Sequence, residues 1–100
     1  MVSKKYSGSQ KAIYNSCKKA LDKLGYKIIS DNVRQGTIKA KKKSSFFSFG
    51  NNISINVSPK NDNEIELLIK SESIGIQIID WGTNSEIEND LIQLVSSYLI

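Results

Sequence analysis

Residues 52–58, with the sequence NISINVS, show the clearest structural pattern in the chain. Isoleucine and valine alternate with serine and asparagine, which is the period of a β-strand with one buried and one solvated face. A polar turn at residues 59–63 follows, and the apolar residues of 64–71 alternate in the same way. The two segments predict an antiparallel hairpin, so the fold is expected to be built around a sheet.

Three further strands are expected before this hairpin. Residues 2–6 form a short opening strand, residues 26–30 a second strand and residues 37–42 a third, with a turn-rich link at 31–36. Short links between alternating strands predict an antiparallel meander. Residues 74–80 alternate less cleanly, so they are expected to be either another strand or an extended connection packed on the core.

A helix is predicted between the opening strand and the meander. The stretch Ser7-Gly8-Ser9-Gln10 supplies the chemistry of a helix start, because a serine side chain can accept from the free N–H groups of a first helical turn. Ser7 and Gln10 also have the spacing of a capping box. Gly25 follows the last apolar residue of the segment and is expected to end the helix in a left-handed conformation. The apolar residues that fall on one helical face are Ile13, Cys17, Ala20, Leu21 and Leu24.

A second amphipathic helix is predicted from about residue 83 to the end of the sequence. Thr83 with Glu86, and Ser85 with Glu88, each have the spacing of a capping box. Acidic residues in the first turns also favour the helix dipole. The apolar stripe of this helix is expected to consist of Ile87, Leu91, Leu94, Val95 and Tyr98.

The expected order of elements is β-α-β-β-β-β-α in a single domain, residues 1–100. Each helix has one apolar stripe and each strand one apolar face, so the fold class is α+β. The predicted architecture is a two-layer sandwich, in which a four- to five-stranded antiparallel sheet carries two helices on one face. A chain of 100 residues, 39% of them hydrophobic, is large enough to build one core.

The absence of histidine and the presence of a single cysteine exclude several kinds of site. His-based metal sites and Ser-His or Cys-His catalytic pairs need residues that the chain lacks. No glycine-rich phosphate loop or nucleophile elbow is found, so we expect a non-enzymatic protein without a cofactor. One cysteine makes no internal disulfide, and no apolar leader or membrane span is seen, which predicts a cytoplasmic location.

The charges are distributed unevenly along the chain. Residues 1–43 carry a net charge of +10 and residues 44–100 a net charge of −6, which gives +4 overall. Such asymmetry is typical of a protein that binds an anionic partner. It is also expected where the two halves of a chain neutralise each other in the fold.

The strongest candidate binding site is a basic and aromatic segment. Lysines can neutralise phosphates and exposed aromatic rings can stack on bases, which suits nucleic acid. The same residue types suit a membrane surface, with lysines at anionic headgroups and phenylalanines inserted. Alternatively, the phenylalanines close the core and the lysines protect a strand from edge pairing. The segment consists of Lys39, Lys41, Lys42, Lys43, Phe46, Phe47 and Phe49.

Asp80, Trp81 and Gly82 form a second candidate motif. An exposed tryptophan would anchor a partner protein. A tryptophan before a helix can instead pack over the core, with Gly82 supplying the turn and Asp80 accepting a backbone hydrogen bond. Cys17 lies in the apolar stripe of the first helix and is interpreted as a small buried hydrophobic residue.

Two motifs carry a resemblance to a known family. Leu24-Gly25-Tyr26 ends the first predicted helix, and Asp80-Trp81-Gly82-Thr83-Asn84 precedes the second. In this layout the chain resembles, over nearly its whole length, a family of small uncharacterised prokaryotic α+β domains. That resemblance implies no activity. A weaker likeness is to the helix-grip folds, which hold apolar ligands between a bent sheet and a C-terminal helix.

Three classes of function remain open. A protein-interaction module, or a homodimer, would use the solvated face of the sheet, the phenylalanine segment or an oppositely charged surface. A nucleic-acid-binding protein would use the basic and aromatic segment, through which a peripheral membrane contact is also conceivable. A carrier of a small apolar ligand would use space between the sheet and the C-terminal helix.

Overall fold

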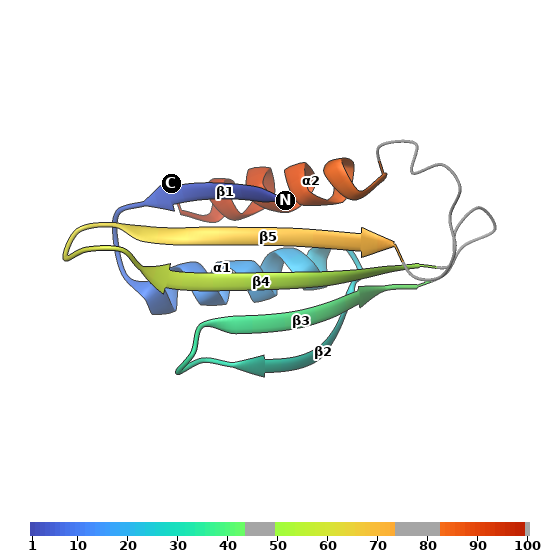
Figure 1. Ribbon diagram of the computed structural model, residues 1–100, viewed down its shortest axis with the longest axis horizontal. Helices are drawn as coiled ribbons and strands as arrows, with labels where there is room; N and C mark the ends of the chain where they lie inside the picture. The colour runs from blue at the N-terminus through green and yellow to red at the C-terminus, as the bar shows by residue number, and fades with distance from the viewer. Residues whose placement is uncertain (44–49, 74–82, 100) are drawn as a thin grey trace.

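The computed structural model describes residues 1–43, 50–73 and 83–99 as one sheet covered by two helices (Figure 1). The order is the predicted β-α-β-β-β-β-α, and the α+β fold class is confirmed. Residues 74–80, the Asp80-Trp81-Gly82 motif and the three phenylalanines lie outside the described residues. The elements are β1 (Val2–Tyr6), α1 (Gln10–Lys23), β2 (Lys27–Asn32), β3 (Thr37–Lys42), β4 (Asn51–Pro59), β5 (Ile65–Ser73) and α2 (Thr83–Tyr98).

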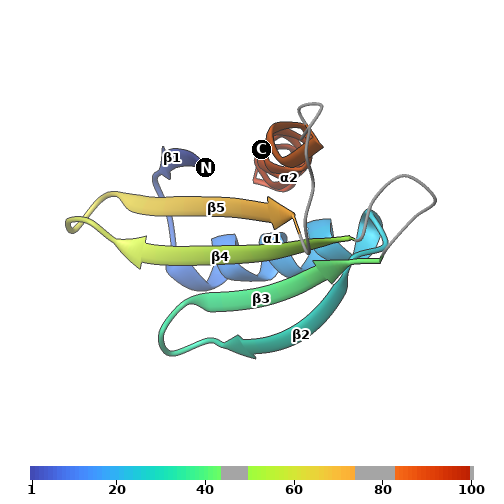
Figure 2. The same ribbon diagram turned by 45° about the vertical axis from the view of Figure 1, so that its right-hand side comes forward.

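The five strands pair in the order β1-β5-β4-β3-β2, and every pair is antiparallel. Strands β2 to β5 form the predicted meander, with one connection per hairpin. Strand β1, at the start of the sequence, is added to this meander by pairing with β5, so that Val2 lies opposite Ile69. β1 and β2 are therefore the two edges of the sheet. Helix α1 lies behind the sheet in both views (Figures 1 and 2), and α2 packs against β5 and β1.

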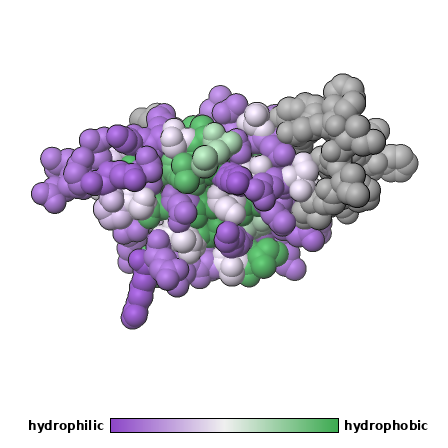
Figure 3. Space-filling model, in the orientation of Figure 1, coloured by the Kyte–Doolittle hydropathy of each residue, from purple (hydrophilic) through white to green (hydrophobic). Residues whose placement is uncertain are grey.

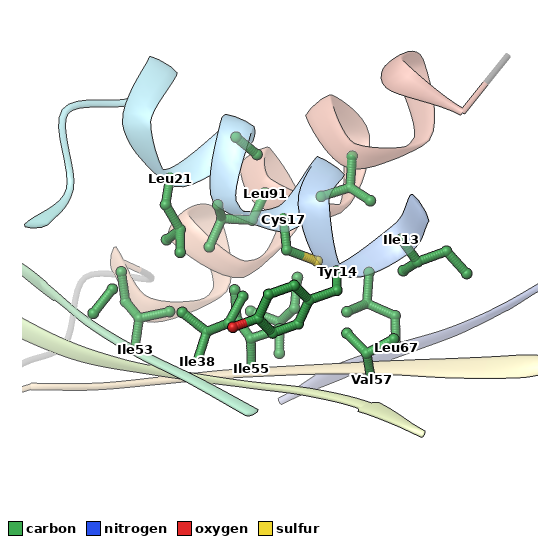
Figure 4. Close-up of a cluster of buried hydrophobic side chains, with 14 of the residues drawn as sticks. Ile13, Tyr14, Cys17, Leu21, Ile38, Ile53, Ile55, Val57, Leu67 and Leu91 are labelled. Carbon is green, nitrogen blue, oxygen red and sulfur yellow. The ribbon is translucent and has the colours of Figure 1, made fainter. Parts of the chain in front are cut away.

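The core lies between the sheet and the two helices (Figure 4). Strand β4 shows why the sequence builds it, because Ile53, Ile55 and Val57 are buried toward the helices while the polar residues between them are not. Helix α1 contributes the predicted stripe and also Tyr14, which the stripe did not include and which is 2% exposed. The same buried cluster includes Cys17, Leu21, Ile38, Leu67, Ile69, Ile87, Leu91 and Val95.

Helix α1 begins within the predicted stretch of residues 7–10. Ser9 is the N-cap, and its hydroxyl oxygen accepts a hydrogen bond from Ala12 N at 3.0 Å. The capping box of Ser7 and Gln10 was wrong, because Gln10 Nε2 donates instead to the carbonyl oxygen of Val57 at 2.7 Å. The side chain of Gln10 thus ties the start of α1 to strand β4.

Helix α1 ends as predicted at Gly25, which has a φ of 78°. Gly25 N donates to Asp22 O at 3.0 Å, and Tyr26 N donates to Leu21 O at 2.9 Å. This pair of hydrogen bonds is the Schellman motif, which satisfies the last carbonyls of a helix and turns the chain back. The turn delivers the chain directly into β2.

A second glycine fixes the hairpin of β2 and β3. Gly36 has a φ of 70°, and a Cβ atom there would lie 2.1 Å from Val57 O. Only glycine fits both the conformation and the space. Asn32 Oδ1 accepts from the backbone of Arg34 at 3.1 Å and of Gln35 at 3.2 Å, which shapes the turn before it.

Helix α2 buries Ile87, Leu91 and Val95 as predicted, while Leu94 is half-buried. Tyr98 was expected in the apolar stripe but is 37% exposed, and the ammonium group of Lys19 lies 5.4 Å from its ring centroid. Tyr98 therefore lies at the margin of the core, while Leu99 still packs against it. Neither helix in the described part of the chain is long and apolar enough to cross a lipid bilayer.

Candidate functional site

The sheet face that points away from the helices, here called the open face, is the candidate site. Figure 3 views it directly, and hydrophilic residues cover most of it around small apolar areas. The pattern follows from the strands, because each buried apolar residue is followed by a residue on the opposite side. On β3 and β4 the residues of the open face are Thr37, Lys39, Lys41, Asn52, Ser54, Asn56 and Ser58.

Three lysines project from the part of the open face formed by β2 and β3. Lys27 and Lys41 lie directly opposite each other in the antiparallel register, and both are exposed. Lys39 lies two residues from Lys41 on the same strand, and its Nζ donates to Ser54 Oγ at 3.1 Å. Like charges directly opposite each other destabilise a sheet, so the fold alone does not favour this arrangement.

The carboxylates of the open face lie on β5 and are paired. Glu72 Oε1 lies 2.8 Å from Lys70 Nζ, and Glu66 Oε1 lies 3.3 Å from Lys60 Nζ. The hydrogen bond from Lys70 holds the pKa of the Glu72 carboxyl below its usual value. Among the described residues, no carboxylate projects from the β2 and β3 part of this face, which is therefore left positively charged.

A shallow hollow of about 280 Å³ interrupts the open face beside these lysines. A β-bulge between Ile28 and Ser30 shifts the register of β2, and Ile29 is 57% exposed at that point. Bulges re-aim side chains and are frequent beside functional sites. The hollow is lined by Ile29 of β2, Lys39 and Ala40 of β3, Asn52 and Ser54 of β4, and Glu72 of β5.

The predicted basic segment is divided by the structure. Lys39 and Lys41 lie on the open face, Lys43 follows the end of β3 and is exposed, and Lys42 is half-buried opposite Asn51. The aromatic half of the segment is not among the described residues. Helix α1 lies behind the sheet (Figure 1), so its exposed lysines, Lys11, Lys19 and Lys23, belong to a different layer from the open face.

Lys27 belongs to this site and was missed by the sequence reasoning. The alternation of side chains in the strand could have placed Lys27 on the open face. Ile28 points toward the helices, so its neighbours Lys27 and Ile29 point outward. What was lacking is the register of the hairpin, since the bulge in β2 decides that Lys27 lies opposite Lys41. A bulge is set by contacts across the sheet and leaves little trace in a local pattern.

Buried polar groups join α2 to the end of β5. Glu88 is 4% exposed, its Oε2 accepts from Ser71 N at 2.8 Å, and its Oε1 lies 2.9 Å from the amino group of Met1. Asn84 Oδ1 accepts from Ser71 Oγ at 2.8 Å and from Asn51 Nδ2 at 2.8 Å. Among the described residues, no group donates to Asn51 Oδ1. This cluster fixes the helix on the sheet at the end where β5 finishes.

Cys17 is fully buried, and burial raises the pKa of its thiol to about 12. A thiol that stays protonated is a poor nucleophile, so its interpretation as a small hydrophobic residue fits. In the part of the chain that the structure describes, no cluster of three or more Cys, Asp or Glu side chains is arranged to hold a metal ion. The charged open face is the feature with the clearest capacity for binding.

Comparisons with known proteins bear on the fold. No protein-family model and no curated protein matches this chain. It is similar to a chain in the crystal structure of the adenylate sensor from AMP-activated protein kinase, in complex with 5-aminoimidazole-4-carboxamide 1-beta-D-ribofuranotide. The TM-score is 0.70, the sequence identity is 14%, and 94% of each chain is covered. At this identity the likeness shows a shared fold, and the resemblance to a prokaryotic domain family stays a prediction.

Proposed function

We propose that this protein is a non-enzymatic protein-interaction module that binds an acidic segment of a partner on its open face. The observation that carries the proposal is the opposed pair Lys27 and Lys41, with Lys39 beside it. Asp31 of β2 does not balance them on the open face, because it accepts hydrogen bonds from Tyr14 and Lys18 of α1 on the helix side. The opposed lysine pair lowers stability, and an anionic partner would relieve the repulsion while gaining electrostatic complementarity.

The chemistry of this face favours a protein over a nucleic acid. Proteins that bind single strands combine positive charge with aromatic side chains on which bases stack. Among the described residues, the open face carries no aromatic side chain, and Tyr6 and Tyr26 pack against the core instead. The open face offers amides and hydroxyls between its lysines, which suit carboxylates and peptide groups.

The apolar-ligand carrier has less support. Leu91 and Val95 of α2 belong to one buried cluster with Leu67 and Ile69 of β5, so these side chains fill the space between helix and sheet.

The adenylate sensor with the same fold was crystallised with a ribonucleotide, which is an anion. A free nucleotide is therefore a useful competitor in any binding test.

The test is a fluorescence-anisotropy titration at low and at physiological salt. The probe is a labelled twelve-residue peptide of alternating Glu and Ser, and labelled mixed-sequence RNA is titrated in parallel. The variant carries Lys27→Glu and Lys41→Glu together, which keeps a like-charged pair in the sheet. Its matched control carries Lys11→Glu and Lys23→Glu, which change the net charge equally on exposed positions of α1.

We expect the sheet variant to bind the peptide about tenfold more weakly, because two favourable charges become repulsive, while the control stays within about twofold. Equal losses in both variants would mean that net charge alone attracts the peptide and would overturn the proposal. RNA binding at physiological salt without peptide binding would replace it with the nucleic-acid function. Displacement of the peptide by adenosine monophosphate would point to a small anionic ligand.

A further inference from the structure

The hollow at the bulge of β2 combines groups of opposite character. Ile29 offers an apolar surface that is 57% exposed, and Lys39, Asn52 and Ser54 supply polar groups around it. A single exposed isoleucine is ordinary on a protein surface. Here it lines a concave site of about 280 Å³ together with Lys39 and Glu72, and the charge of Lys39 helps to lower the pKa of the Glu72 carboxyl. An apolar surface within such a polar rim is how a pocket for one side chain is built.

We infer that this hollow is a specificity subsite that takes one apolar side chain of the acidic segment, an inference that rests on the proposed function. The lysines would attract any acidic chain, whereas the hollow would select those that carry an apolar residue at the right place. Charge complementarity therefore sets the approach, and the hollow sets the choice of partner.

The spacing of the site defines the segment that fits. Lys39 and Lys41 are alternate residues of one strand, so they repeat at about 6.8 Å, the same spacing as side chains on one side of an extended peptide. Two alternate acidic residues can face these lysines together. Ile29 lies on the neighbouring strand beside Lys39, so the apolar residue is expected on the same side of the peptide as the acidic ones.

The bulge makes the subsite separable from the basic site. It carries Ile29 on β2, while Lys41 and Lys39 lie on β3. A change at Ile29 leaves all three lysines in place. The basic attraction and the apolar selection can therefore be removed one at a time.

The experiment uses two labelled peptides of equal charge. Both are twelve residues of alternating Glu and Ser, and one central Glu is replaced by Leu in the first peptide and by Gln in the second. Each is titrated into the wild-type protein, into Ile29→Thr, which keeps a β-branched residue in the strand, and into Val33→Ser. Val33 is 54% exposed in the turn after β2 and serves as the matched control.

We expect the wild-type protein to bind the Leu peptide about fivefold more tightly than the Gln peptide, because the half-exposed isoleucine and the leucine shield each other from water. The ratio should fall to about one in Ile29→Thr and stay unchanged in Val33→Ser. Equal binding of both peptides by the wild-type protein would overturn the subsite and leave the proposed function standing. If neither peptide binds, the proposed function itself fails.

Discussion

Strand β4 presents isoleucine and valine to the helices and asparagine and serine to the open face, so one strand takes part in two different surfaces. On the helix side, the apolar side chains pack in one buried cluster, and the buried Glu88 accepts a hydrogen bond from Ser71 N. On the open side, three lysines of β2 and β3 have no described carboxylate partner on their strands. The helix side is thus explained by stability, whereas the open side is explained by binding.

The largest difference in stability is expected between substitutions of two neighbouring leucines of β5 that lie on opposite faces of the sheet. Leu67 is fully buried, and Leu68 is half-buried on the open face. Leu67→Ala should lower the free energy of unfolding by about 2–5 kcal/mol, because it removes buried methyl groups and leaves a cavity. Leu68→Ala should cost less than about 1 kcal/mol. Urea denaturation of both variants measures the difference, and equal losses would contradict the assignment of the two faces.

A smaller change in stability is expected when either of two acidic residues within α2, Glu86 and Glu88, is replaced. Glu88→Ala should lower the free energy of unfolding by about 1–3 kcal/mol, because Ser71 N then loses its acceptor in a buried place. Glu86 is exposed, and Glu86→Ala should change stability by about 0.5 kcal/mol or less. Thermal and urea unfolding of the two variants provide the measurement. If Glu88→Ala is as harmless as its control, the polar cluster does not hold α2 on the sheet.

The smallest expected change in the free energy of unfolding is an increase. Lys27→Glu places an acid opposite Lys41 and should raise the free energy of unfolding by about 0.2–1 kcal/mol. High salt should reduce this gain, since the pair is exposed. Urea denaturation at low and high salt measures it, and a loss of stability would show that Lys27 supports the fold. A more stable variant that binds acidic peptide less well would separate the two roles.

Much of the fold followed from local patterns. The sequence predicted strands β3, β4 and β5 from their period of two, and α1 from its apolar stripe, because each element buries one side only. The partner of β1 was not predicted, because its pairing with β5 joins residues 2–6 to residues 65–69, which lie far apart in the sequence. The start of α1 was predicted within residues 7–10, but the choice between Ser7 and Ser9 was not, because both have the same chemistry and only the path of the backbone distinguishes them.

The candidate site was predictable in part. Lys39 and Lys41 were placed on the solvated side of their strand, but the opposing Lys27 depends on a register that only the folded sheet defines. Glu88 was interpreted as a dipole-stabilising acid, although it shares the helical phase of Leu91 and Val95 and is buried with them. The helical spacing of Glu88 from these two residues indicated that it is buried. The burial was not predicted, because acidic side chains usually stay in water.

The pairing of β1 with β5 also has a consequence for how the chain acquires its structure. Helix α1 and the hairpins of β2 to β5 join residues close in sequence, and such contacts form quickly. β1 must wait until β5 has been synthesised, since Val2 and Ile69 are register partners. From the synthesis of β5 until β1 docks, the outer edge of β5 offers unpaired backbone groups to other chains. Aggregation during synthesis should therefore depend on how soon this earliest strand docks, rather than on the stability of the finished fold.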